Sequence, residues 1–231
     1  MPTQREKYTS KVYLNFKEIG EREYQTIVRF FETHEEDIHK LTFKEYFELL
    51  MAYTDSLFEV GAYSNYIDTC DLAIESTIYF NVKTFRGENI YQKLLFRKAA
   101  SHYQLMQYDA AEYVLLELVK INPENKMALR FLKKCKVSRI PKMVQRTRAI
   151  SIALFFLSAI IIGFELLYVN SLLQDYIANV RLSRNVVFGV GILVLIGGEI
   201  LMRRKIESKV NQMAASIKIS KAKRFRDSDE T

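Results

Sequence analysis

Hydrophobic residues follow two different patterns along this chain of 231 residues. Over roughly the first 140 residues, apolar side chains recur at every third or fourth position, as at Leu49, Tyr53 and Leu57. This spacing places them on one face of a helix. Alternation of the kind found in strands is hard to find. We therefore predict an all-α fold of short amphipathic helices, with breaks near Gly20, Thr42, Gly61, Gly87 and Asn122-Pro123.

Two continuous apolar runs follow this first part, at residues 149–173 and 186–202. The first run is long enough to cross a hydrocarbon core of about 30 Å, and the second is just long enough. Both lie behind a segment that is typical of a soluble domain, so neither is an amino-terminal signal peptide. The sequence thus predicts a two-helix transmembrane hairpin over residues 149–202.

Basic residues flank this predicted hairpin unevenly. Residues 131–148 carry seven Lys and Arg and no Asp or Glu, and residues 203–231 carry nine against four. The connecting segment 174–185 offers only Arg181 and Arg184. Because Lys and Arg accumulate on the cytoplasmic side, we expect a two-pass integral membrane protein with both termini in the cytoplasm.

Residues 1–130 are mildly acidic, with 16 Lys and Arg against 20 Asp and Glu, although the whole chain carries a net charge of +7. The basic character therefore belongs to the segments beside the membrane, and we expect no nucleic-acid partner. No glycine-rich phosphate-binding loop is found. The two cysteines and three histidines are scattered, so we expect no metal site and no cofactor.

Residues 91–125 resemble a tetratricopeptide (TPR) repeat. Counted back from Pro123 as the closing proline, Ala99 and Ala111 take the two small-residue positions at which paired helices touch. A weaker copy covers residues 47–80, with Thr54 and Tyr66 in place of the small residues. Residues 126–138 are expected to form a capping helix.

These patterns and the resemblance together divide the chain into four predicted parts. Residues 1–46 form N-terminal helices, and residues 47–140 form the TPR-like domain with its capping helix. Residues 149–202 form the membrane hairpin, and residues 203–231 form a basic cytoplasmic tail. The fold class expected is thus a short TPR-like stack of helical hairpins followed by a transmembrane hairpin.

TPR-like arrays stack into a superhelix whose concave groove binds peptides or partner helices. The resemblance implies that the first helix of each pair lines this groove. The expected groove residues are mixed aromatic and charged, namely Glu48, Met51, Asp55, Phe58, Lys93, Phe96, Tyr103 and Gln104. Alternatively, the three aromatic side chains pack between neighbouring repeats.

Two acidic residues, Glu165 and Glu199, lie within the apolar runs. A charge in hydrocarbon is costly and by default indicates function. In an antiparallel hairpin the two lie at different depths, and Glu199 can reach Arg203. The pairs Ala159 with Gly163 and Gly191 with Gly198 offer faces for close helix packing, either within the hairpin or between copies in a homo-oligomer.

The function expected from these features is that of a non-enzymatic, membrane-anchored adaptor that recruits a protein or peptide partner at the cytoplasmic face. One alternative is a membrane effector whose oligomerised hairpins perturb the lipid bilayer under control of the helical domain. A more remote alternative is a HEPN-like ribonuclease, because Arg97 and His102 formally match the Arg-x4-6-His pattern of such enzymes.

Overall fold

The computed structural model describes residues 10–139, 142–169 and 177–229. Almost all of these residues are helical, which confirms the all-α prediction. The strands among the described residues form a minimal hairpin of β1 (Thr84–Phe85) and β2 (Glu88–Asn89), which the apolar pattern did not indicate. The chain forms two compact units, residues 1–128 and residues 129–231.

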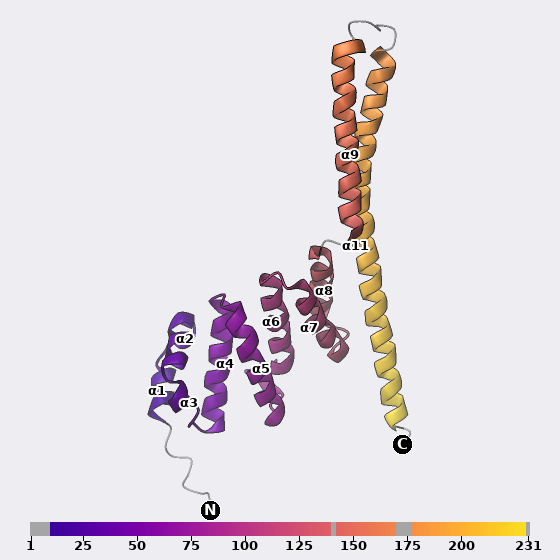
Figure 1. The fold of residues 1–231 in the computed structure, drawn as a ribbon. Coiled ribbons are helices and arrows are strands. Elements are labelled where there is room, and N and C mark those ends of the chain that lie inside the picture. The colour runs from indigo at the N-terminus through magenta and orange to yellow at the C-terminus, as the bar shows by residue number, and fades with distance from the viewer. Residues whose placement is uncertain (1–9, 140–141, 170–176, 230–231) are drawn as a thin grey trace, which may run out of the picture. The chain divides into compact units, whose positions relative to one another are not determined.

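The first unit is a row of helices in which α2 packs on α4, and α4, α5, α6 and α7 each pack on the next (Figure 1). Each predicted break lies between two helices, and helices also end at Thr33 and Gln104, where no break was predicted. Gly61 and Gly87 adopt the positive φ angles that glycine tolerates. The helices are α1 (Lys11–Lys17), α2 (Tyr24–Thr33), α3 (Glu35–Ile38), α4 (Phe43–Glu59), α5 (Tyr63–Tyr79), α6 (Ile90–Gln104), α7 (Tyr108–Ile121) and α8 (Lys126–Ser138), the last of which crosses the boundary between the units.

Helix α4 packs on both α2 and α5. At its first turn the Glu45 carboxylate accepts hydrogen bonds from the Thr42 backbone N–H and hydroxyl, at 3.4 and 2.9 Å. This arrangement satisfies donors that a helix start leaves free. Along α4, Leu49, Leu50 and Leu57 are almost completely buried, so one face of the helix belongs to the core and the other remains available for a site.

Small residues lie where α6 meets α7. Ala99 of α6 and Ala111 of α7 are both fully buried. In the preceding pair, Tyr66 is also fully buried, and its hydroxyl donates to the Leu94 carbonyl of α6 at 3.4 Å. Cys70 lies one turn further on, and burial raises the pKa of its thiol to about 12. The large Tyr66 is thus accommodated because it reaches the next helix.

The second unit contains two long helices that run antiparallel and pack side by side (Figure 1). Helix α9 (Lys142–Phe164) continues into a π-helical turn, η2 (Glu165–Val169), and α11 extends from Ile177 to Asp229. Both α9 with η2 and α11 are long and apolar enough to cross a membrane. The structure differs from the prediction of a connecting segment at residues 174–185, because residues 177–185 belong to α11. Residues 170–176 lie outside the described part of the chain.

Glycines set the distance between α9 and α11. A Cβ atom added at Gly191 would lie 2.9 Å from Phe155 Cε1, and one added at Gly198 would lie 2.8 Å from Thr147 Oγ1. By contrast, nothing lies within 4 Å of such an atom at Gly163. The Gly191 and Gly198 pair therefore serves packing of the hairpin on itself, which is one of the two roles that the sequence indicated.

Candidate partner-binding pocket

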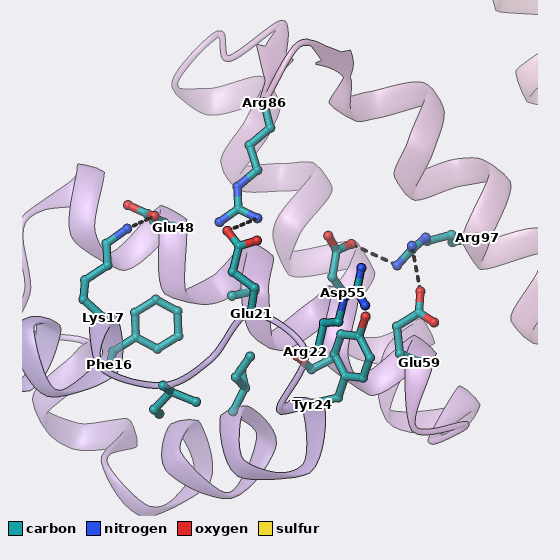
Figure 2. Close-up of a pocket in the computed structure, with 14 residues that line it drawn as sticks. Phe16, Lys17, Glu21, Arg22, Tyr24, Glu48, Asp55, Glu59, Arg86 and Arg97 are labelled. Carbon is teal, nitrogen blue, oxygen red and sulfur yellow. Dashed lines mark hydrogen bonds and ion pairs between the residues drawn. The ribbon is translucent and has the colours of Figure 1, made fainter.

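A pocket of about 370 Å³ opens in the first unit over the polar face of α4 (Figure 2). Its apolar walls come from Phe16, Ile19, Ile27 and Ala52. Charged side chains from α1, the segment before α2, α4, the β-hairpin and α6 complete it. These are the carboxylates Glu21, Glu48, Asp55 and Glu59 and the cations Lys17, Arg22, Arg86 and Arg97.

The α4 side of the pocket follows from helical spacing. Glu48, Asp55 and Glu59 are separated by seven and four residues, and Ala52 fills the remaining step. Residues at these intervals share one face of a helix. The three carboxylates therefore form a row, with the small Ala52 leaving space between them.

Arg97 of α6 bridges two carboxylates of this row. Its Nη1 lies 3.1 Å from Asp55 Oδ1 and its Nη2 lies 2.9 Å from Glu59 Oε1. The guanidinium also lies over the Phe58 ring, 4.8 Å from its centroid. Lys93, one turn earlier, contacts the second oxygen of Asp55 at 3.1 Å. The planar fork of Arg fits such double contacts, which makes Arg97 the main link between α4 and α6.

Glu48 is held from the other side, by α1. Its carboxylate accepts hydrogen bonds from Lys17 and from the Tyr13 hydroxyl. Partial burial alone raises the pKa of Glu48, but these hydrogen bonds and nearby positive charges outweigh burial and hold the pKa below its usual value. Glu48 is thus a charged and already partnered group at physiological pH.

Two arginines of the pocket, Arg86 and Arg22, make fewer ion pairs and hydrogen bonds than Arg97. Arg86 Nη1 contacts Glu21 Oε1 at 3.7 Å, and Glu21 is mostly exposed. Arg22 makes no ion pair or hydrogen bond with the part of the chain that the structure describes. Figure 2 shows Lys17, Arg86 and Arg97 approaching the central carboxylates from different elements. The α4 carboxylates are thus satisfied within the protein, whereas Arg22 remains available to a ligand.

The structure distributes the expected groove residues over several environments. Glu48 and Asp55 line the pocket, and Lys93 contacts Asp55 beside it. Phe58 lies under Arg97 and packs edge-on against Tyr63 and Tyr66.

Like Lys93 and Phe58, the other four expected groove residues do not line this pocket. Met51 is 1% exposed and belongs to the core, so it forms no part of any surface. Phe96 is half-buried, the Tyr103 ring packs edge-on against Tyr108, and Gln104 is exposed at the end of α6.

Several pocket residues were missed by sequence reasoning. Lys17, Glu21, Arg22 and Tyr24 lie before the repeat-like region, and Arg86 lies in the segment between the two copies. A signal was present in the dense charges around Gly20, in the stretch KEIGEREY. It could not be used, because only tertiary packing brings this stretch to α4.

The Arg97 and His102 pair does not form a joint site. The Arg97 guanidinium is taken by Asp55 and Glu59, and His102 Nδ1 lies 2.7 Å from Gln107 Oε1. Among the described residues, no group of three or more His, Cys, Asp or Glu side chains is placed to hold a metal ion.

The two acidic residues of the apolar helices have different environments. Glu165 is 5% exposed, and its two oxygens accept hydrogen bonds from Arg181 Nε and Arg184 Nη1, each at 2.9 Å. Glu199 is exposed and contacts Arg203 of the next turn at 2.8 Å. The two do not meet, and Glu165 is bonded across the helix pair, to residues that the sequence had placed in the connecting loop.

Comparison with known proteins adds no relative: no protein-family model matches this chain, and no similar curated protein or solved structure was found.

Proposed function

We propose that this chain is a non-enzymatic adaptor that is anchored in a membrane and binds a segment of a partner protein in the pocket on α4. The observation that carries the proposal is the combination of an apolar wall with an unpartnered cation. Phe16, Ile19 and Ile27 offer contact to an apolar side chain, and Arg22 offers an ion pair to a neighbouring carboxylate.

The helical arrangement supports a TPR-like architecture for the first unit. Helices α4 with α5 and α6 with α7 form successive hairpins, and α8 follows them in the chain. Ala99 and Ala111 are buried at the expected small positions. Stacked helical hairpins are typically binding scaffolds, although the fold alone does not fix the ligand.

The anchoring part of the proposal rests on the surface of the second unit. Only 17% of the most apolar window in each long helix is buried, and Phe156, Ile160 and Leu193 are each more than 60% exposed. A core helix of a soluble protein would bury such side chains, whereas lipid accepts them. The basic flanks favour a two-pass topology with both termini in the cytoplasm.

A pocket variant with a matched control tests the adaptor function. We would tag the full-length protein, cross-link it in its native cells and compare recovered proteins quantitatively between variants. Arg22→Glu reverses the free cation of the pocket, and Arg29→Glu makes the same change on the exposed face of α2. A partner that the wild type and Arg29→Glu retain and Arg22→Glu loses would support the proposal. Identical recovery from all three proteins would refute it.

A membrane effector is the second candidate, and the buried Glu165 of the hairpin favours it. The exposed Ala159 and the open space at Gly163 leave one face of α9 available to a second copy, as homo-oligomerisation would require. Exchanging the hairpin for an unrelated two-helix anchor distinguishes the two candidates. An adaptor keeps its activity after this exchange, and an effector loses it.

A further inference from the structure

Glu165, Arg181 and Arg184 form a charged cluster with one excess positive charge. Glu165 comes from the π-helical turn after α9, and the two arginines lie three residues apart on α11, where they share one face. Each arginine donates to a different oxygen of the carboxylate, at 2.9 Å. The single carboxylate therefore neutralises only one of the two guanidinium groups.

The donors of the two arginines are used to different extents. Arg184 donates Nη1 to Glu165, and its Nε and Nη2 both contact Asn185 Oδ1 at 3.2 Å. Arg181 donates only Nε. Its two terminal amino groups make no hydrogen bond or ion pair within the described segments, and its side chain is 58% exposed. The excess charge of the cluster is thus presented by Arg181.

The register of the hairpin gives the depth of this cluster. Gly198 faces Thr147, Gly191 faces Phe155, and Arg184 faces Glu165, so the contacts proceed in order along both helices. The apolar stretch from Val186 to Met202 spans about 25 Å at about 1.5 Å per residue. Arg203 and Arg204 follow its cytoplasmic end, and Arg184 precedes its other end. Arg181 therefore lies near the far boundary of a hydrocarbon core, at the level of lipid phosphates.

We propose that Arg181 binds the phosphate of an anionic lipid at this boundary. A guanidinium with two free amino groups matches a phosphate bidentately. Leu166 and Leu182, each 64% exposed, adjoin Glu165 and Arg181 in sequence and offer contact to the acyl chains. The excess positive charge favours an anionic headgroup over a zwitterionic one. This inference rests on the membrane insertion proposed above.

Native mass spectrometry of the full-length protein from mixed micelles tests the site. The probes are phosphatidylglycerol and phosphatidylcholine with identical acyl chains, and inorganic phosphate. We expect the wild type to bind phosphatidylglycerol about fivefold more tightly than phosphatidylcholine, the effect of one charge near the surface. Arg181→Gln should abolish this preference. Ser183→Gln introduces the same amide in the same helical turn and should retain it.

Three outcomes would overturn the lipid site, and each points to a different cause. An unchanged preference in Arg181→Gln, with unaltered helical content by circular dichroism, would overturn the inference while leaving the anchor in place. Displacement of the lipid by millimolar inorganic phosphate would assign the site to a free anion and also overturn it. Failure of the wild type to remain in membranes after alkaline extraction would overturn the proposed anchoring, and the lipid site with it.

Discussion

Gly198 of α11 faces Thr147 of α9 so closely that a Cβ atom at position 198 would lie 2.8 Å from the threonine Oγ1. The same atom would lie 2.9 Å from two carbons of that side chain. The neighbouring Gly197 has nothing within 4 Å of the equivalent position. Adjacent glycines of one helix thus have opposite roles, since only one of them is required for contact with α9.

Replacing Gly198 with valine should separate the two helices, because the contact with Thr147 leaves no room for a side chain. Overpacking of this kind costs about 1–3 kcal/mol. Nitroxide labels at the exposed Ile152 and Leu193 would report the distance between α9 and α11 by pulsed electron paramagnetic resonance. We expect a longer or broader distribution in Gly198→Val. Gly197→Val is the control and should match the wild type. Equal distributions in both variants would contradict the glycine contact.

Removing the carboxylate of Glu165 should weaken the hairpin at its far end. Glu165→Leu leaves Arg184 facing an apolar group, and breaking a buried ion pair costs about 3–5 kcal/mol. Because Arg181 is partly exposed to solvent, we expect Glu165→Leu to destabilise the hairpin by about 1–3 kcal/mol. Steric trapping of doubly biotinylated protein in bicelles would measure the free energy of helix separation. Glu199→Leu removes an exposed carboxylate from the same hairpin and should change this free energy much less. A comparable loss in both variants would show that burial of Glu165 is unimportant.

Residues 1–139 should fold without the membrane helices, since residues 1–128 already form a compact unit with its own core. Ala111→Leu should destabilise this fragment by about 1–3 kcal/mol, because position 111 is fully buried beside α6. Urea unfolding followed by circular dichroism would measure the effect. Ala110→Leu, at a half-buried neighbouring position, should cost less than about 1 kcal/mol. A non-cooperative transition in the wild-type fragment would contradict the expectation of independent folding.

The regular features of this chain could be predicted from its sequence, and the contacts between distant segments could not. Periodicity located most of the breaks between helices, but not those after Thr33 and Gln104, and run length located the two apolar helices. The pocket depends instead on pairs such as Lys17 with Glu48, which are far apart in the chain and meet only through packing of α1 on α4. The bond from Arg181 to Glu165 was missed because the sequence placed Arg181 in a loop, whereas α11 already begins at Ile177.

Arg97 should be the strongest single electrostatic link between α4 and α6. Arg97→Met retains much of the aliphatic length but removes both ion pairs and the contact with the Phe58 ring. Because these groups are partly exposed, we expect a loss of about 1–2 kcal/mol in the urea stability of residues 1–139. Arg29→Met, on the exposed face of α2, should change stability by less than about 0.5 kcal/mol. A double-mutant cycle with Asp55→Ala would then give a coupling energy, and zero coupling would contradict the bridging role.

Glu48 should make the free energy of unfolding of the first unit depend on pH in the acidic range. Its pKa is lower in the folded protein than the usual value, so the folded state binds fewer protons at this carboxyl than the unfolded state. The resulting stabilisation is fully present above the unfolded pKa of about 4.3 and is lost as the pH falls through the lower folded pKa. We therefore expect the stability difference between wild type and Glu48→Gln to be constant from pH 7 to 5 and to shrink below about pH 4. Urea unfolding of residues 1–139 across this range would measure it. Glu36→Gln removes an exposed carboxylate of α3 and is the control. A parallel pH dependence in the two variants would rule out a specific role for the Lys17 and Tyr13 hydrogen bonds.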